Sequence, residues 1–98
     1  MTTKPLLEKD IEKRVCKYAE SKGLLQYKFT SPNRSSVPDR LFFTKKGTPF
    51  FIEFKRPGKT LTVAQKREAE RLIARSINVF IVDDVEVGKL LIDSMENQ

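Results

Sequence analysis

The sequence of 98 residues contains no histidine and a single cysteine, Cys16. Without histidine, the chain cannot build a Ser-His-Asp triad, a Cys-His protease pair or a nuclease site that uses histidine. A lone cysteine cannot form an internal disulfide, and it offers no zinc-type spacing. Any general acid or base must therefore be a carboxylate, a lysine, a tyrosine or a water bound to a metal ion.

Long apolar segments are also missing from the sequence. No apolar run approaches the ~20 residues that a membrane-spanning helix needs, and residues 1–7 do not resemble a signal peptide. We therefore expect a cytoplasmic protein with no membrane partner. Hydrophobic residues make up 39% of the chain and are interspersed with charged ones, which is typical of a folded domain. The length predicts a single domain over residues 1–98 with a modest core.

Positive charge exceeds negative charge, with a formal net charge of +6. Such a surplus suggests a polyanionic partner such as nucleic acid, although an ordinary basic protein is the alternative. Residues 55–75 carry seven basic and two acidic side chains, whereas residues 83–98 carry five acidic and one basic. The positive charge is therefore concentrated directly after the strand that holds the candidate site.

The spacing of apolar residues and turn residues predicts the order helix, three strands, helix, strand, helix. Leu7, Ile11, Val15 and Tyr18 recur at helical spacing, and Gly23 is a stop signal for that helix. Predicted helices cover residues 6–22, 62–75 and 85–95, and predicted strands cover residues 25–30, 39–44, 50–56 and 78–82. This order predicts an α/β fold in which helices flank a small mixed β-sheet.

The strand expected at 50–56 carries the first candidate site residues. Side chains alternate between the two faces of a strand, so Phe50, Ile52 and Phe54 would enter the core while Glu53 and Lys55 share the other face. The carboxylate can hold a divalent cation, and the lysine can orient a water or stabilise phosphate charge. The alternative is an exposed strand face with charge pairs between strands.

Asp39 adds a second carboxylate, fourteen residues before Glu53 and directly after Pro38. If the two strands form a hairpin around Gly47, they run antiparallel, and Asp39 lies near the Lys55 end of its partner. Two carboxylates on neighbouring strands can hold magnesium, which lowers the pKa of bound water. The alternative is a turn residue that follows proline.

Gln65 falls between Leu61 and Ala69 on the core-facing side of the second predicted helix. A polar side chain in that position needs a partner. The edge of the site around Lys55 or the backbone of a substrate would supply one. A partly exposed helix glutamine is the alternative.

Taken in order, Pro38-Asp39, Ile52-Glu53-Phe54-Lys55 and Gln65 resemble the PD-(D/E)xK nuclease superfamily, and within it the VRR-NUC family of small phage and bacterial nucleases. Small Holliday-junction resolvases look similar. The resemblance extends from residue 12 to residue 82 and implies a restriction-endonuclease-like core. Family members often carry glycine where Val37 stands, which affects the shape of the preceding loop more than the chemistry.

The resemblance implies roles by matching position. Asp39, Glu53 and the backbone carbonyl of Phe54 would bind Mg²⁺, with Mn²⁺ as a substitute, and Lys55 and Gln65 would join them as catalytic residues. A glutamate on the first helix often completes such sites. Glu12 precedes Gly23 by eleven residues, as in the resolvase-like pattern, and is preferred; Glu8, one turn away, is the alternative.

These implications predict a magnesium-dependent DNA endonuclease of a bacterial or phage-infected cell. We expect selectivity for Holliday junctions or flapped DNA, a homodimer and no small-molecule cofactor. The alternatives are a non-catalytic DNA-binding module with a nuclease fold and a basic subunit of a larger complex. Candidate contacts to DNA phosphates are Arg34, Ser35, Ser36, Arg56, Lys59, Lys66 and Arg67.

Overall fold

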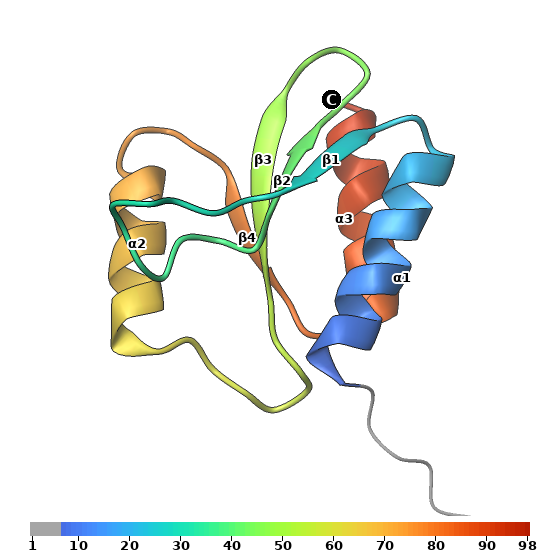
Figure 1. The fold of residues 1–98 in the computed structure, drawn as a ribbon. Coiled ribbons are helices and arrows are strands. Elements are labelled where there is room, and N and C mark those ends of the chain that lie inside the picture. Colours follow the sequence, from blue (N-terminus) through green and yellow to red (C-terminus); the bar gives the residue numbers. More distant parts are fainter. Residues whose placement is uncertain (1–6) are drawn as a thin grey trace, which may run out of the picture.

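The computed structural model describes residues 7–98, which form a four-stranded sheet with helices on both sides (Figure 1). The helices are α1 (Glu8–Ser21), α2 (Val63–Ile73) and α3 (Val85–Glu96), and the strands are β1 (Leu25–Lys28), β2 (Arg40–Phe43), β3 (Pro49–Phe54) and β4 (Val79–Val82). The predicted order of elements and the small mixed sheet flanked by helices are confirmed.

The strands lie in the order β1-β2-β3-β4. The first three are antiparallel neighbours, and β4 runs parallel to β3 after the crossover through α2. Gly47 closes the β2–β3 hairpin with a φ of 88°, a conformation that glycine adopts at little cost. Its amide donates to the carbonyl of Thr44 at 2.8 Å. This turn sets a register in which Arg40 pairs with Ile52.

The apolar core lies between one face of the sheet and the pair α1 and α3, which pack against each other. Phe50, Ile52 and Phe54 of β3 all reach this core and are fully buried, as predicted. The two helices approach closely at Gly88 of α3, where an added Cβ would stand 2.5 Å from Cγ2 of Val15. The side chains of this core are Ile11, Val15, Cys16, Ala19, Leu24, Phe42, Phe50, Ile52, Phe54, Val82, Ile92 and Met95.

The opposite side of the sheet carries α2, which contacts β4 (Figure 1). The connection from β1 to β2 crosses this side. Within it, the ring of Phe29 packs edge-on against Phe51 of β3 at 5.0 Å, and the amide of Phe29 donates to the carbonyl of Asp39 at 2.9 Å. Asp39 is thus fixed at the point where β2 begins. Within residues 7–98, the structure contains no helix long and apolar enough to cross a membrane.

Candidate active site

Two carboxylates meet where β2 begins and β3 ends. Because Arg40 pairs with Ile52, the preceding residue Asp39 stands opposite Glu53 on the other face of the sheet. Oδ2 of Asp39 accepts a hydrogen bond from the amide of Phe54 at 2.7 Å. Glu53 is only 5% exposed. The alternative of an exposed strand face with solvated charges is therefore wrong for Glu53.

The environment of Glu53 favours its protonated form. Its pKa is raised from 4.5 to about 8, first by burial, then by a hydrogen bond with Asp39 and by the negative charge of Asp39; the positive charge of Lys55 offsets part of this increase. Two neighbouring carboxylates repel each other when both are ionised. A cation bound between them would relieve this repulsion, so the pair suits a metal ion chemically.

Lys55 follows directly after β3 and is half-buried. Its amide donates to the carbonyl of Val82 at 2.9 Å, which continues the pairing of β3 with β4 by one residue. The backbone of Lys55 is therefore held in the sheet, although the strand itself ends at Phe54. The positive charge of Lys55 lowers the pKa of both Glu53 and Glu8, against the larger effects that raise it.

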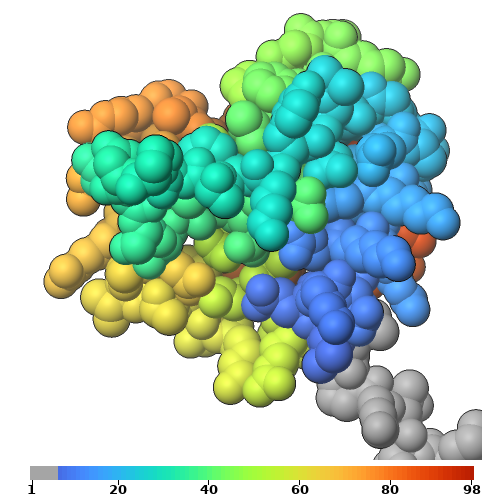
Figure 2. Space-filling model, in the orientation of Figure 1, coloured from blue at the N-terminus to red at the C-terminus, as the bar shows by residue number. Residues whose placement is uncertain are grey.

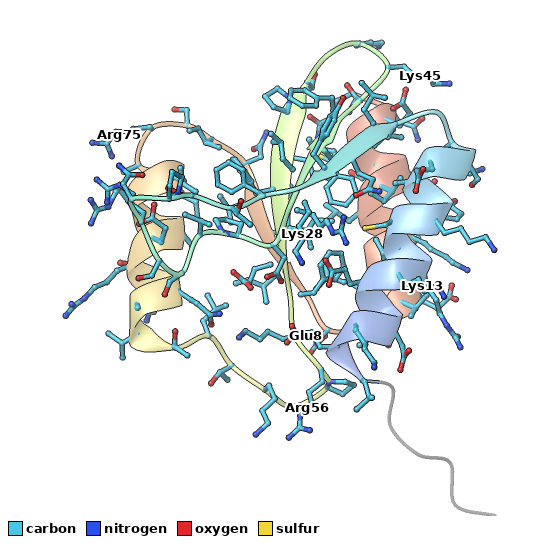
Figure 3. All side chains as sticks on the ribbon, viewed as in Figure 1. Glu8, Lys13, Lys28, Lys45, Arg56 and Arg75 are labelled. Atoms are coloured by element: carbon cyan, nitrogen blue, oxygen red, sulfur yellow. The ribbon has the colours of Figure 1, made fainter. Side chains whose placement is uncertain are left out.

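The first helix brings Glu8 within range of the charges of Asp39 and Lys55. The pKa of Glu8 is raised by burial and by the negative charge of Asp39, and lowered by the charges of Lys55 and Arg56. Figure 3 shows Glu8 at the start of α1, on the side of the molecule where the chain leaves the sheet toward Arg56. The first turn of α1 therefore faces the end of β3.

Glu12, one turn further along α1, is turned toward another partner. Its Oε2 accepts a hydrogen bond from Nε of Arg40 at 2.6 Å. Arg40 is the neighbour of Asp39 on β2, so its side chain leaves the opposite face of the sheet, toward α1. The charge of Asp39 acts on Glu8, whereas Glu12, the preferred glutamate, forms an ion pair with Arg40, so both glutamates stay candidates for the helix carboxylate.

Gln65 lies in the first turn of α2, where it forms a capping box with Thr62. Its side-chain Oε1 accepts a hydrogen bond from the backbone amide of Thr62 at 3.0 Å. The backbone amide of Gln65 in turn donates to Oγ1 of Thr62 at 3.1 Å. The side chain is partly exposed. The side-chain carbonyl of Gln65 thus has a local partner, and within residues 7–98 Gln65 forms no hydrogen bond with Asp39, Glu53 or Lys55.

The candidate phosphate-binding residues lie in three segments: the β1–β2 connection, the turn after β3, and α2. Arg34, Ser35 and Arg67 line a cavity of about 320 Å³ between the β1–β2 connection and α2. Arg56 and Lys59 flank a tight turn with Pro57 and Gly58 at its centre, in which the amide of Lys59 donates to the carbonyl of Arg56 at 3.1 Å. Ser36 lies in the same connection as Arg34, and Lys66 is exposed in α2.

Within residues 7–98, no three acidic or cysteine side chains lie close enough together to form a ready metal cluster. Cys16 is buried, and burial raises the pKa of its thiol to about 12. Magnesium is often held by one or two carboxylates and keeps several waters. The pair Asp39 and Glu53 fits that kind of site better than a site enclosed entirely by protein ligands.

Comparison with known proteins gives two close similarities. The protein named "Putative nuclease p44" of Acyrthosiphon pisum secondary endosymbiont phage 1 is 38% identical over 84 residues, which span 86% of this chain and 90% of that protein. A solved structure described as "VRR_NUC domain" matches with a TM-score of 0.81 and 31% identity, over 88% of this chain and 94% of that chain. No model of a protein family matches the sequence.

Proposed function

This chain belongs to the VRR-NUC family of nucleases, and from that premise we propose that it is a magnesium-dependent endonuclease that hydrolyses phosphodiester bonds in DNA. Its sheet and helices form the restriction-endonuclease-like core expected from the sequence. The observation that carries the proposal is the pairing of the buried carboxylate of Glu53 with the half-buried Asp39, on which the charge of Lys55 also acts.

In this proposal Asp39, Glu53 and the carbonyl of Phe54 would hold Mg²⁺, and Mn²⁺ would be able to replace it. Such an ion stabilises negative charge on the phosphate and lowers the pKa of water. Asp39 is already held in place by the amide of Phe54. A bound cation would favour the carboxylate form of Glu53, whose proton would pass to water.

Lys55 is the proposed catalytic lysine. Its backbone is held by the bond to Val82, so the ammonium group extends from a rigid part of the sheet toward the carboxylates. From there Nζ can donate a hydrogen bond to the attacking water or to a phosphate oxygen as charge develops on it. Glu8, across from β3 at the start of α1, is placed to orient water on the helix side of the site.

The proposal extends to branched or flapped DNA as the preferred substrate and to a homodimer. A chain of 98 residues offers limited surface for a branched substrate, and a symmetric dimer would place two sites on one junction. Arg34 precedes the two carboxylates along the chain, and Arg56, Lys59 and Arg67 follow them. Contacts from them to phosphates would position the DNA without reading its sequence.

A cleavage assay tests this function. Purified protein is incubated with linear duplex, flapped and four-way-junction DNA in Mg²⁺, in Mn²⁺ and with chelator. We expect cleavage only with metal, and none from Lys55→Ala. Lys13→Ala, which removes an exposed lysine of α1, is the matched control and should cleave like the unmodified protein. Salt-dependent binding of DNA without cleavage in either metal would support a non-catalytic DNA-binding module instead.

A further inference from the structure

A cavity of about 340 Å³ lies between α2 and the connection from β1 to β2. Figure 2 shows these two segments, the connection in teal and α2 in gold, side by side on one flank of the molecule. Phe29, Val37 and Leu72 give the cavity an apolar lining, and Arg71 and Arg75 contribute guanidinium groups. Its volume lies in the range of roughly 300–1,000 Å³ that is typical of sites for small molecules.

A carboxylate forms part of the wall of this cavity. Glu68 is only 8% exposed, and it lines both this cavity and its neighbour of about 320 Å³. Nη1 of Arg34 and Nε of Arg71 stand 3.8 and 3.7 Å from its Oε2. These distances give charge attraction but exceed those of hydrogen bonds. The carboxylate therefore keeps the capacity to accept hydrogen bonds from a group inside the cavity.

We propose that this cavity holds the base of an unpaired nucleotide of the DNA substrate, and this inference rests on the proposed nuclease function. Unpaired bases are bound by stacking on aromatic rings and on the planes of arginine side chains, which Phe29 and the arginines supply. Glu68 would repel a phosphate inside the cavity, but it can accept hydrogen bonds from the amino groups of bases. The phosphates would remain at the rim beside Arg34, Arg71 and Arg75.

The cavity is connected to the candidate active site through Phe29. The amide of Phe29 is bonded to the carbonyl of Asp39, and its ring packs on Phe51. Phe51 precedes Glu53 by two residues on the same face of β3, a spacing of about 7 Å along a strand. A nucleotide close to the cleaved phosphodiester can therefore reach the cavity, which would give the enzyme a means to select DNA that is unpaired next to the cut.

An abasic substitution tests this inference without relying on cleavage. Duplexes with a short single-stranded flap of either polarity are bound to the Lys55→Ala variant with calcium in place of magnesium. The unpaired nucleotides next to the junction either carry their bases or are abasic. We expect the abasic flap to bind about tenfold more weakly, as for the loss of one stacked base. Equal affinity for the two flaps would overturn the inference.

The pocket variant Arg71→Ala with Arg75→Ala, made in the same background, completes the experiment. Its binding should lose most of its dependence on the bases, because the arginine planes that stack on them are gone and only the ring of Phe29 remains. Arg14→Ala with Lys17→Ala removes the same charge at the α1–α3 side of the molecule and should keep the tenfold preference. A pocket variant that keeps the preference would assign the base to another place on the protein.

Cleavage by the protein with an intact Lys55 separates this inference from the proposed function. Metal-dependent cleavage that is indifferent to abasic substitution would overturn the pocket and leave the nuclease function standing. A preference for intact bases that the pocket variant loses, without any cleavage in Mg²⁺ or Mn²⁺, would support the pocket and overturn the nuclease function.

Discussion

Oδ2 of Asp39 accepts a hydrogen bond of 2.7 Å from the backbone amide of Phe54, the residue that separates Glu53 from Lys55. This bond joins the start of β2 to the end of β3. The two proposed ligand residues and the lysine therefore belong to one rigid corner of the sheet. Asp39 would therefore have two roles, as the acceptor of the hydrogen bond from Phe54 and as a ligand of the cation. A substitution that keeps the acceptor but removes the charge can separate them.

Asp39→Asn should abolish cleavage while the fold remains intact. The amide oxygen of asparagine can still accept the hydrogen bond from Phe54, but the lost negative charge removes a proposed metal ligand. We expect cleavage to fall at least about 100-fold, since a catalytic metal ion contributes several kcal/mol, and metal binding measured by calorimetry to weaken in parallel. Asp84→Asn is the control, because Asp84 caps α3 through the amide of Val87 and asparagine caps equally well. Unchanged cleavage by Asp39→Asn would remove Asp39 from the site.

The stability of the metal-free protein should depend on the protonation of Glu53. Its pKa is about 8 in the folded protein against 4.5 as its ordinary value, so between these values the native state binds more protons than the unfolded state. The free energy of unfolding then decreases as pH rises from about 5 to 8. With no histidine in the chain, few other groups titrate in this window.

Thermal unfolding with chelator at pH 5, 6.5 and 8 measures this dependence. The melting temperature should fall with rising pH, and Glu53→Gln, which carries no titratable proton, should flatten the curve. Added magnesium should recover stability at pH 8, because the cation favours the ionised pair. A melting temperature that rises steadily over the same range would contradict the raised pKa of Glu53.

The two glutamates of α1 should separate activity from stability. Glu8→Gln removes a charge that acts on Asp39 and Lys55, so we expect slower cleavage with little change in melting temperature. Glu12→Gln weakens the 2.6 Å ion pair with Arg40; that hydrogen bond stays possible but loses its charge, at a cost on the order of 1 kcal/mol. We expect this variant to be less stable and to retain most cleavage. The opposite pattern in cleavage rates and melting temperatures would place Glu12 in the site.

The sequence predicted the order of elements because its turns are marked by glycine and proline. Gly23 follows α1, Gly47 closes the hairpin with a φ of 88°, and Pro57 with Gly58 follows β3. Since the hairpin turn fixes the register, the opposition of Asp39 and Glu53 also followed from local signals. The core of the candidate site was therefore predictable from two strands and one turn.

The choice between Glu8 and Glu12 was not predictable, because both lie on the same side of α1, one turn apart. Which of them meets Asp39 depends on how far α1 extends past the end of β3, a property of helix packing. One signal was available: alternation along β2 places Arg40 on the face opposite Asp39, which offers Glu12 a cation. Glu68 is buried where α2 packs near Arg34 of the β1–β2 connection. Because these two segments are far apart in the sequence, no local pattern predicts the burial of Glu68.

Gly88→Ala should destabilise the protein although alanine is the better helix former. An added Cβ would stand 2.5 Å from Cγ2 of Val15 and 3.2 Å from Cγ1 of Val82. Overpacking of this kind costs about 1–3 kcal/mol, which outweighs the gain of about 1 kcal/mol in helix propensity. Chemical denaturation measures the difference, with Ser94→Ala at an exposed position of α3 as the control. A more stable Gly88→Ala protein would show that α1 and α3 can move apart freely.

Substitutions of Gln65 can separate the role of its side-chain carbonyl in capping α2 from a role of its NH₂ group in binding DNA. Its carbonyl oxygen caps α2 by accepting from the amide of Thr62, which leaves the NH₂ group to donate to a phosphate of the DNA. Glutamate at this position keeps the capping box and favours a helix N-terminus, but it has no such donor and repels phosphate. Gln65→Glu should therefore keep the melting temperature and bind DNA several-fold more weakly. Gln65→Ala should have a lower melting temperature and also bind DNA more weakly, because alanine has neither the acceptor for Thr62 nor the donor for phosphate. If Gln65→Glu binds and cleaves DNA normally while Gln65→Ala is only less stable, the side chain serves α2 alone and has no part in the active site.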